Sequence, residues 1–375
     1  SFIKPSWCID SHSPSFFSFL ASLARERGID VRVLIWHPVA SQNTFFRNVF
    51  APADSSKHQW LTEVIGTTAT TTVTGSTVKI RWDLSVDGSH CHHEKSWIVD
   101  GSTDDPIAFT GGLIPSESWM TDQIHTDPTK MHDVFVQIQG PCAVDVVHSF
   151  VHRWNQAKGH DQPFGCFPSL QTADDLPWPK ALPPPPHHGT AVCQIVRDIN
   201  HASYNDDGVQ PPVGMTVMRP ISNGETSILS AYQQAISRAQ KTIYIENQHI
   251  AHAGLLEMLK QATDRGVKVI FIVPSALLSS MHGMMGTVAE WTMKWKMTGR
   301  FMQGMDWMYR KVRTTKNESS RYSHAFLDVL PSLAGPNFLL AGLAAPHLTP
   351  PQGIYVHSKL MIVDDILHHW VSQHG

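Results

Sequence analysis

This chain of 375 residues has few cysteines, a small net charge and no long apolar runs. Five scattered cysteines, an odd number, exclude a dense disulfide framework and indicate a reduced compartment. A net charge of -3 at pH 7 excludes a protein that a global positive field draws to nucleic acid. No apolar run is long enough to cross a membrane, and no signal peptide is recognisable. We therefore expect a cytoplasmic protein with a large buried core.

Histidine, by contrast, is abundant, and two of the 23 histidines open the same phrase. Residues 93–100 and 357–364 both read His-x-Lys followed by four residues and an Asp. Roughly 0.06 matches to this phrase are expected by chance, so two copies indicate a shared function. One histidine can attack a phosphorus atom while the other protonates the leaving oxygen, which gives a duplicated motif a mechanism.

The spacing inside each motif fits a strand. Side chains two residues apart share one face of a strand, because successive residues point to opposite faces. His93 and Lys95 should therefore project together, as should His357 and Lys359. An imidazole and an ammonium group on the same face can act on one substrate.

The remainder of each motif predicts a buried strand that ends at the Asp. The apolar runs 97–99 and 360–363 are typical of strands buried on both faces. Each Asp lies seven positions after its histidine, an odd offset that turns it away from that histidine. We expect Asp100 and Asp364 at strand ends. There each Asp either orients the imidazole of the opposite motif or caps a turn.

The double motif resembles the signature of the phospholipase D superfamily. Other parts of the chain are similar to the eukaryotic-type phospholipases of that family, namely residues 111–112, 132–134, 140–141, 153–155, 225–228 and 244–248. The resemblance runs from near Leu20 to Asp365 and so covers most of the chain.

The resemblance implies a role for each motif residue. His93 would attack phosphorus and form a phosphohistidine, and His357 would protonate the departing alcohol. Lys95 and Lys359 would hold the non-bridging phosphate oxygens, so the chemistry requires no metal ion and no organic cofactor. The implied reaction converts a glycerophospholipid such as phosphatidylcholine to phosphatidic acid and an alcohol, with transphosphatidylation when an alcohol replaces water. The implied partner is a phospholipid membrane surface, with peripheral association.

Two other functions fit the same motifs. A nuclease or other phosphodiesterase of the superfamily would use the same residues, although the small net charge and the phospholipase-like stretches argue against nucleic acid as a partner. A catalytically dead, truncated relic is the other, because the chain begins without Met and stops ten residues after Asp365. We expect that residues 366–375 do not replace the strand that the family places after the second motif.

Five further residues are weaker candidates for substrate binding. Gly111 and Gly112 let a substrate approach the backbone closely, or else form an ordinary turn. Glu246, Asn247 and Gln248 end a predicted strand, where they line the cleft or cap the strand end.

Two stretches invite other interpretations. Residues 90–93 contain three histidines and one cysteine, but their spacing is too tight to converge on zinc, so we predict no metal site. Residues 281–316 combine methionine, tryptophan and basic residues at helical spacing. That composition fits either a helix at a membrane surface or a helix in the core.

The two halves of the chain repeat one layout. Helical spacing over residues 13–28 is followed by a strand at 29–36, and residues 255–266 and 267–273 repeat this order. The pattern predicts an α/β fold with two similar α/β/α lobes from an internal duplication, mixed sheets, and an active site on a pseudo-twofold axis at the lobe interface. We expect an N-terminal lobe at 1–165, a Pro-rich linker at 166–222 and a C-terminal lobe at 223–375. The sequence predicts no particular oligomeric state.

Overall fold

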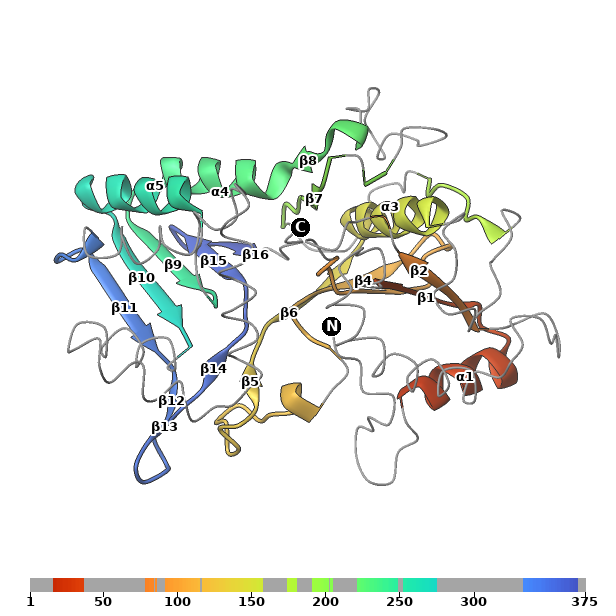
Figure 1. The fold of residues 1–375 in the computed structure, drawn as a ribbon, viewed down its shortest axis with the longest axis horizontal. Helices are drawn as coiled ribbons and strands as arrows, with labels where there is room; N and C mark the ends of the chain where they lie inside the picture. The colour runs from red at the N-terminus through yellow and green to blue at the C-terminus, as the bar shows by residue number, and fades with distance from the viewer. Residues whose placement is uncertain are drawn as a thin grey trace, which may run out of the picture. The chain divides into compact units, whose positions relative to one another are not determined.

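The structure is a computed structural model of the chain (Figure 1). It describes residues 16–36, 78–83, 85, 92–114, 117–157, 174–180, 191–201, 203–204, 221–248, 252–274 and 333–369. Within these ranges no helix is both long and apolar enough to cross a membrane. Helices and strands in several small sheets make up the described elements, which confirms the predicted α/β class.

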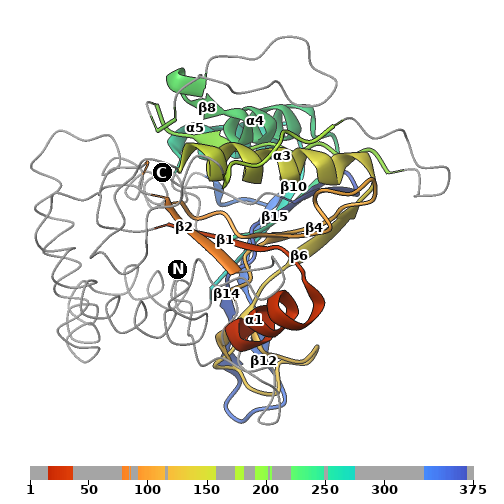
Figure 2. The same cartoon turned by 90° about the vertical axis from the view of Figure 1, so that its right-hand side faces the viewer.

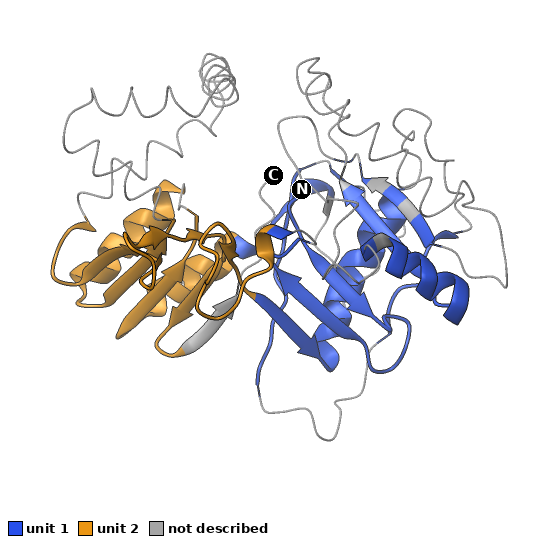
Figure 3. Ribbon diagram, turned by 90° about the horizontal axis from the view of Figure 1, so that it is seen from below, with its two compact units in different colours: residues 1–117, 135–228, 371–375 blue, residues 118–134, 229–370 orange. Residues whose placement is uncertain are grey.

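The chain divides into two compact units (Figure 3). The first unit contains residues 1–117, 135–228 and 371–375, and the second contains residues 118–134 and 229–370. Residues 118–134, which the sequence assigns to the N-terminal lobe, therefore belong to the second unit. The described parts of the predicted linker belong to the first unit.

The described part of the first unit combines a parallel pair of strands, an antiparallel sheet and helices. Its elements are α1 (Phe16–Arg27), β1 (Val31–Trp36), β2 (Val78–Asp83), β3 (Ser96–Val99), β4 (Ile107–Gly111), β6 (Phe135–Gln139), α3 (Pro141–Gln156), β7 (Asp198–Ile199) and β8 (Glu225–Thr226). β1 runs parallel to β2, and β4 lies between β3 and β6, antiparallel to both. The helix and strand predicted for residues 13–36 are confirmed by α1 and β1.

Helix α3 supplies much of the first unit's core. Gly140, with a φ of 86°, turns the chain after β6, and Pro141 at the start of the helix needs no amide hydrogen there. Small and branched side chains of the helix then pack on the antiparallel sheet. The resulting apolar cluster consists of Ala108, Ala143, Val146, Ile98, Ile138 and Ile195.

Part of the Pro-rich segment is fixed against α3 and does not act as a free connector. The indole of Trp154 donates to the carbonyl oxygen of Asp174 over 3.0 Å. The side chain of Asn155 donates to the carbonyl oxygen of Leu176 and accepts from its amide, over 2.9 and 2.8 Å. Residues 174–180 are therefore bound to the first unit, and the remainder of the segment's Pro-rich run at 181–190 lies outside the described residues.

The second unit is built around a five-stranded sheet in the order β11-β10-β9-β15-β16. Its elements are η2 (Glu117–Trp119), β5 (Met131–His132), α4 (Ser227–Arg238), β9 (Thr242–Glu246), α5 (Ala253–Asp264), β10 (Lys268–Val273), β11 (Phe338–Gly342), β12 (Ala344–Ala345), β13 (Gln352–Gly353), β14 (Tyr355–Val356), β15 (Leu360–Val363) and β16 (Ile366–His369). β9, β10 and β11 are parallel, and β15 is antiparallel to β9. Helices α4 and α5 lie on the same side of this sheet (Figures 1 and 2), with α5 packed against β10.

The two motif strands differ in burial. In β15, Leu360, Met361 and Val363 are all buried, so the prediction of a strand buried on both faces is correct there. In β3 that prediction is wrong, because Val99 is 48% exposed and Trp97 is only half-buried. β15 is a central strand with neighbours on both sides, which explains its deeper burial.

A strand does follow the second motif, contrary to the expectation from the sequence. Residues Ile366–His369 form β16, which pairs antiparallel with β15. Asp364 and Asp365 make the turn, with φ angles of 48° and 65°. A two-residue hairpin of type I′ needs positive φ at both central residues, and Asp tolerates this region better than most residues. The absence of glycine from the turn was therefore a misleading signal.

Candidate active site

The second motif lies at the point where the chain enters β15. His357, Ser358 and Lys359 are all buried, at 8%, 0% and 6% exposure. The short strand β14 pairs with β5 immediately before them. This pairing lets the amides of His357 and Ser358 both donate to the carbonyl oxygen of His132, over 2.8 and 3.2 Å. The backbone of the motif is thus fixed by a segment far away in sequence.

Asp133 is the carboxylate that orients the second motif's imidazole. Its Oδ2 lies 2.6 Å from Nδ1 of His357, and its side chain is 1% exposed. Burial alone raises the pKa of the Asp133 carboxyl, but the bonds from His357, the Trp119 indole and the Val134 amide hold it below the ordinary value. An ionised carboxylate only accepts, so Nδ1 of His357 carries a hydrogen and Nε2 is the nitrogen suited to proton transfer.

Trp119 contacts both members of this pair. Its Nε1 donates to Oδ2 of Asp133 over 2.8 Å. Its ring meets the His357 ring edge-on, with centroids 5.4 Å apart and an interplanar angle of 88°. The indole therefore restrains both the carboxylate and the imidazole.

Asp364 caps a turn, which is one of the two roles expected of it, and the other role, orienting the opposite motif's imidazole, stays a prediction. Its Oδ1 accepts from the amides of Lys241 and Thr242 over 2.7 and 2.9 Å, and its Oδ2 accepts from the amide of Gln240 over 2.8 Å. These amides belong to the two residues before β9 and to the first residue of that strand. The seven-residue spacing places Asp364 beyond the end of β15, on the side of the turn.

Glu246, at the end of β9, binds Ser358, the residue after the second motif's histidine. Its Oε2 accepts from Ser358 Oγ over 2.6 Å and lies 3.1 Å from His132 Nε2, while Tyr244 donates to Oε1 over 2.6 Å. Burial raises the pKa of Glu246, but these partners lower it below its ordinary value. The bond with Glu246 raises the pKa of His132 against the effect of burial. Glu246 is thus a buried support of the motif.

Asn247 and Gln248 follow Glu246 as the strand ends. The Asn247 amide donates to the carbonyl oxygen of Ile272, and its Oδ1 accepts from the Gln248 amide over 2.8 Å. Gln248 Nε2 donates to the hydroxyl of Tyr355 over 2.7 Å, and the Tyr355 ring lies 6.5 Å from that of His357. Asn247 therefore finishes the strand, whereas Gln248 reaches the surroundings of the motif.

The two motifs share one local hydrogen bond. Lys95 Nζ donates to the carbonyl oxygen of His93 over 2.6 Å, and Lys359 makes the matching bond to His357. His93 and Lys95 are half-buried. In both motifs the ammonium group is thereby held next to its own histidine.

Three further candidates belong to the first unit. Asp100 is exposed, has a φ of 55°, and accepts from the amide and hydroxyl of Thr103 through its carbonyl oxygen, as expected of a turn residue. Its orienting role stays a prediction. Gly111 and Gly112 are buried where β4 ends, and the Gly111 amide donates to the carbonyl oxygen of Lys95 over 3.4 Å. Gly111 thus connects β4 to the first motif.

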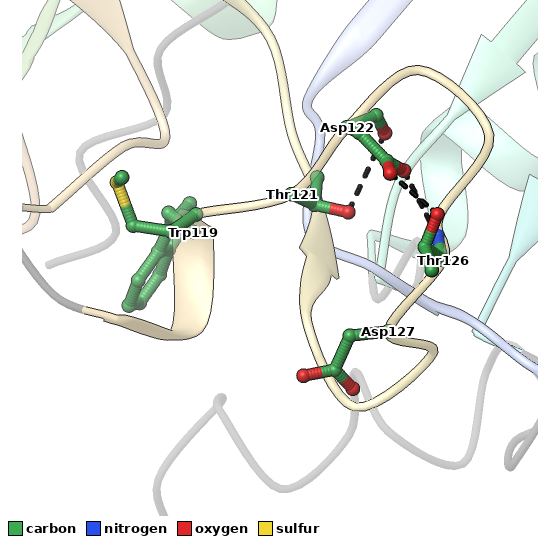
Figure 4. Close-up of a pocket in the computed structure, with 6 residues that line it drawn as sticks. Trp119, Thr121, Asp122, Thr126 and Asp127 are labelled. Atoms are coloured by element: carbon green, nitrogen blue, oxygen red, sulfur yellow. Dashed lines mark hydrogen bonds between the residues drawn. The ribbon is translucent and has the colours of Figure 1, made fainter. Parts of the chain in front are cut away.

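A pocket of about 440 Å³ opens beside Trp119 (Figure 4). It is lined by Trp119, Met120, Thr121, Asp122, Thr126 and Asp127. Asp122 accepts from the amide and hydroxyl of Thr126, so the loop that forms the pocket is held in shape by its own bonds. Because Trp119 also contacts His357, the pocket borders the second motif.

Comparison with known proteins finds similarity to phospholipases D. A family profile described as Phospholipase D matches residues 115–254. "Phospholipase D alpha 1" of Oryza sativa subsp. japonica is 22% identical over 350 residues, which cover 76% of this chain and 43% of the relative. "Phospholipase D alpha 2" of Arabidopsis thaliana is 24% identical over 300 residues, covering 68% and 35%. "Phospholipase D A" of Dictyostelium discoideum is 28% identical over 274 residues, covering 68% and 18%. The chain is therefore similar to phospholipases D of the eukaryotic type over most of its length.

These similar proteins are eukaryotic phospholipases D, and the chain spans less than half the length of each. The matched profile contains Trp119, Asp133 and Glu246, whereas both His-x-Lys motifs lie outside it. A solved structure of polyphosphate kinase from Porphyromonas gingivalis is 10% identical, with a TM-score of 0.31 over 72% of this chain and 32% of that one. A likeness that weak carries no argument.

The sequence motifs of this chain did not identify Asp133 or Trp119 as site residues. The available signal was the phospholipase-like stretch 132–134, which contains Asp133. Among the described residues, no three His, Cys, Asp or Glu side chains converge in a way that could hold a metal ion. His90 and Cys91 lie outside the described residues, and independence from metal ions stays a prediction.

Proposed function

We propose that this chain carries the catalytic residues of a phospholipase D that hydrolyses the terminal phosphodiester of glycerophospholipids such as phosphatidylcholine. The observation that carries the proposal is the buried His357–Asp133 pair next to Lys359. An imidazole whose tautomer is fixed by a carboxylate is suited to move a proton, and an adjacent ammonium group is suited to a phosphate oxygen. The similarity to phospholipases D supports a phosphoric diester hydrolase.

In the first step, His93 attacks phosphorus and a phosphorus–nitrogen bond forms. The bond from phosphorus to the headgroup oxygen breaks, and Nε2 of protonated His357 gives its proton to that oxygen. Asp133 stabilises the imidazolium before the transfer, because its charge is held 2.6 Å from Nδ1. Lys95 and Lys359 balance the charge that gathers on the non-bridging oxygens.

In the second step, neutral His357 removes a proton from water, which attacks phosphorus. The phosphorus–nitrogen bond breaks, His93 is regenerated, and phosphatidate leaves. A primary alcohol in place of water gives a phosphatidylalcohol by the same route. Both products come from a single covalent intermediate, so their ratio depends on the concentrations of water and alcohol.

The proposed architecture is an internal duplication with the active site on a pseudo-twofold axis. Helix–strand pairs support it: α1 precedes β1 and α5 precedes β10, and each strand has a parallel neighbour that follows it in sequence, β2 and β11. Each motif strand also pairs antiparallel with the next strand of the chain, β3 with β4 and β15 with β16. One active site would draw one histidine from each repeat.

The proposed partner is a phospholipid surface, to which a cytoplasmic enzyme binds peripherally. Its substrate would be part of a bilayer, so the enzyme needs a surface that contacts lipid headgroups. Residues 281–316, with their basic and tryptophan side chains, suit this contact, and they lie outside the described residues.

Lipid and nucleic-acid substrates test the proposal directly. The protein is incubated in parallel with phosphatidylcholine vesicles plus a short primary alcohol and with single-stranded DNA. We expect phosphatidic acid and phosphatidylalcohol, and intact DNA. DNA cleavage without lipid hydrolysis would support the nuclease alternative, and inactivity on both would support the relic. Phosphatidic acid without any phosphatidylalcohol would argue for direct attack by water.

A further inference from the structure

A buried cluster of charged and polar side chains lies under the first motif. At its centre is Asp83, the last residue of β2, which is fully buried. Five groups surround its carboxylate: the guanidinium of Arg153, the hydroxyls of Tyr204 and Ser85, the amide of Ser85 and the imidazole of His92. This many partners allow a buried carboxylate to remain charged.

Arg153, in the last turn of α3, links Asp83 to the motif itself. Its Nε and Nη2 donate to Asp83 Oδ2 over 3.3 and 3.2 Å, and its Nη1 donates to Glu94 Oε2 over 2.9 Å. Glu94 is the residue between His93 and Lys95. One planar guanidinium therefore bridges a buried strand end and the centre of the motif, which a lysine ammonium cannot do with the same geometry.

The cluster holds His92, on the other side of His93, as well. His92 Nε2 lies 3.3 Å from Asp83 Oδ2 and 2.9 Å from Ser85 Oγ. Its ring stacks on that of Tyr204, with centroids 5.8 Å apart. Both sequence neighbours of His93 are therefore anchored to the same buried carboxylate or to its arginine.

Anchoring both neighbours fixes the direction of His93. In an extended chain alternate residues face the same way, so His92 and Glu94 share one face while His93 and Lys95 share the other. If His92 and Glu94 are bound in the buried cluster, His93 and Lys95 are directed away from it. Rotation of the chain would require several buried hydrogen bonds to break together.

The second motif has support of the same kind, which strengthens the functional interpretation. There Glu246, also at the end of a strand, is bonded to Ser358 of the motif, to His132 and to Tyr244. In each unit a strand-end carboxylate that also bonds a tyrosine hydroxyl binds a residue beside the motif histidine. The first unit adds Arg153.

We propose that Asp83 and Arg153 are positioning residues of the first motif, which hold His92 and Glu94 and thereby direct His93 and Lys95 toward the phosphate. The proposal rests on the proposed function, because it assumes that His93 reacts with substrate. The two residues touch no substrate themselves. Their contribution is to reduce the freedom of the nucleophile.

Arg153→Lys is the main test, because it keeps the positive charge and removes the bridge. With a soluble short-chain phospholipid as substrate, we expect kcat to fall roughly 10–100-fold while KM changes little, since a small misplacement of a reacting group is that costly. Arg197→Lys is the matched control. Arg197 is another arginine of the first unit, half-buried where Arg153 is buried, and its carboxylate partner is Glu225, outside the motif. Its turnover should remain near that of the unmodified protein.

A second readout does not depend on activity. The imidazole signals of His93 are followed by NMR in ¹⁵N-histidine-labelled protein and assigned with His93→Ala. Arg153→Lys should shift or broaden these signals, whereas Arg197→Lys should leave them in place. If Arg153→Lys does not fold, Tyr204→Phe, which removes one hydroxyl donor to Asp83, is measured in its place with a smaller shift expected.

The outcomes separate this proposal from the proposed function. No hydrolysis by the unmodified protein contradicts the proposed function, and the NMR signals still decide whether the cluster positions His93. Unchanged His93 signals together with unchanged kcat in a folded Arg153→Lys protein would overturn the positioning role. A fall in kcat that Arg197→Lys reproduces equally would also overturn it, because the effect would then reflect general destabilisation.

Discussion

Asp133 and Asp364 show how the surroundings of a carboxylate decide its role near the second motif. Asp133 is buried and receives bonds from His357, Trp119 and a backbone amide. Asp364 is at the surface, and its bonds go to backbone amides before β9. A hydrogen bond shielded from water is stronger and more directional than an exposed one, so only Asp133 can fix an imidazole firmly.

We predict that Asp133→Asn lowers kcat by about 10²–10⁴-fold, because the neutral amide no longer stabilises the His357 imidazolium or fixes its tautomer. Steady-state hydrolysis of a soluble phospholipid measures the effect. Asp364→Asn is the control, and it should lower the melting temperature while turnover is retained. A larger loss of turnover in Asp364→Asn than in Asp133→Asn would show that the roles are reversed.

The site could be predicted from the sequence only where its residues are close together in the chain. The histidine and lysine of each motif are two residues apart, and the structure shows the same lysine-to-carbonyl bond in both. The partner of His357 is 224 residues away in sequence, so no local spacing could reveal it. The odd spacing correctly excluded Asp364 as the partner of His357, and the hairpin turn directs its carboxylate to the amides at the start of β9.

The hairpin of β15 and β16 depends on backbone conformation at two aspartates. Both have positive φ, a region in which a residue with a side chain is strained unless it is Asn or Asp. We predict that Asp365→Val destabilises the protein by about 1–2 kcal/mol relative to Asp365→Asn. Urea unfolding of the two variants measures the difference. Equal stability of the two would mean that the turn does not adopt this conformation.

The pair formed by His132 of β5 and Glu246 of β9 should make stability depend on pH. The pKa of His132 is raised in the folded protein. Its contribution to the free energy of unfolding is therefore complete below about pH 6.5, its pKa in the unfolded chain, and is lost as pH rises through its pKa in the folded protein. The pKa of Glu246 is lowered in the folded protein. Its contribution to the free energy of unfolding is therefore present above about pH 4.3, its pKa in the unfolded chain, and is lost as pH falls through its pKa in the folded protein. His125 and Asp133 are the other titratable groups facing His132.

We predict that His132→Gln costs most stability between about pH 4.3 and 6.5, where both partners are charged. Denaturant midpoints of the variant and the unmodified protein at pH 5.5 and 8.5 provide the comparison. His125→Gln should show no such maximum, because burial and the charge on His132 lower the pKa of His125. A cost for His132→Gln that is the same at both pH values would contradict the ion pair.

Long periodic elements were predictable, and short ones were not. The helix and strand expected over 255–273 correspond to α5 and β10, because an amphipathic helix and a buried strand both leave a repeating pattern. Strands β5 and β14 have two residues each, too few to show alternation. Their pairing depends on contacts across the chain, and it is this pairing that positions His357.

At the scale of the whole molecule, the two motif lysines should take the place of a metal ion. We predict that EDTA leaves hydrolysis of a soluble, monomeric phospholipid unchanged, because in the proposed mechanism Lys95 and Lys359 supply positive charge to the phosphate. Turnover with and without EDTA, with excess calcium as a further comparison, measures this. Loss of turnover on the soluble substrate would contradict the lysine mechanism, whereas calcium stimulation on vesicles alone would reflect membrane binding.

The assignment of residues 118–134 to the second unit has a consequence for how the protein is made. These residues lie between β4 and β6 of the first unit, yet they carry Trp119, His132 and Asp133. Asp133 leaves the ribosome 224 residues before His357, an interval of roughly 10–45 s at about 5–20 residues per second. During that interval the Asp133 carboxylate and the Trp119 indole have no His357 to bind. Two separately expressed halves cut near residue 222 would have to complete this site by diffusion, because the C-terminal half would lack the segment that holds its own histidine.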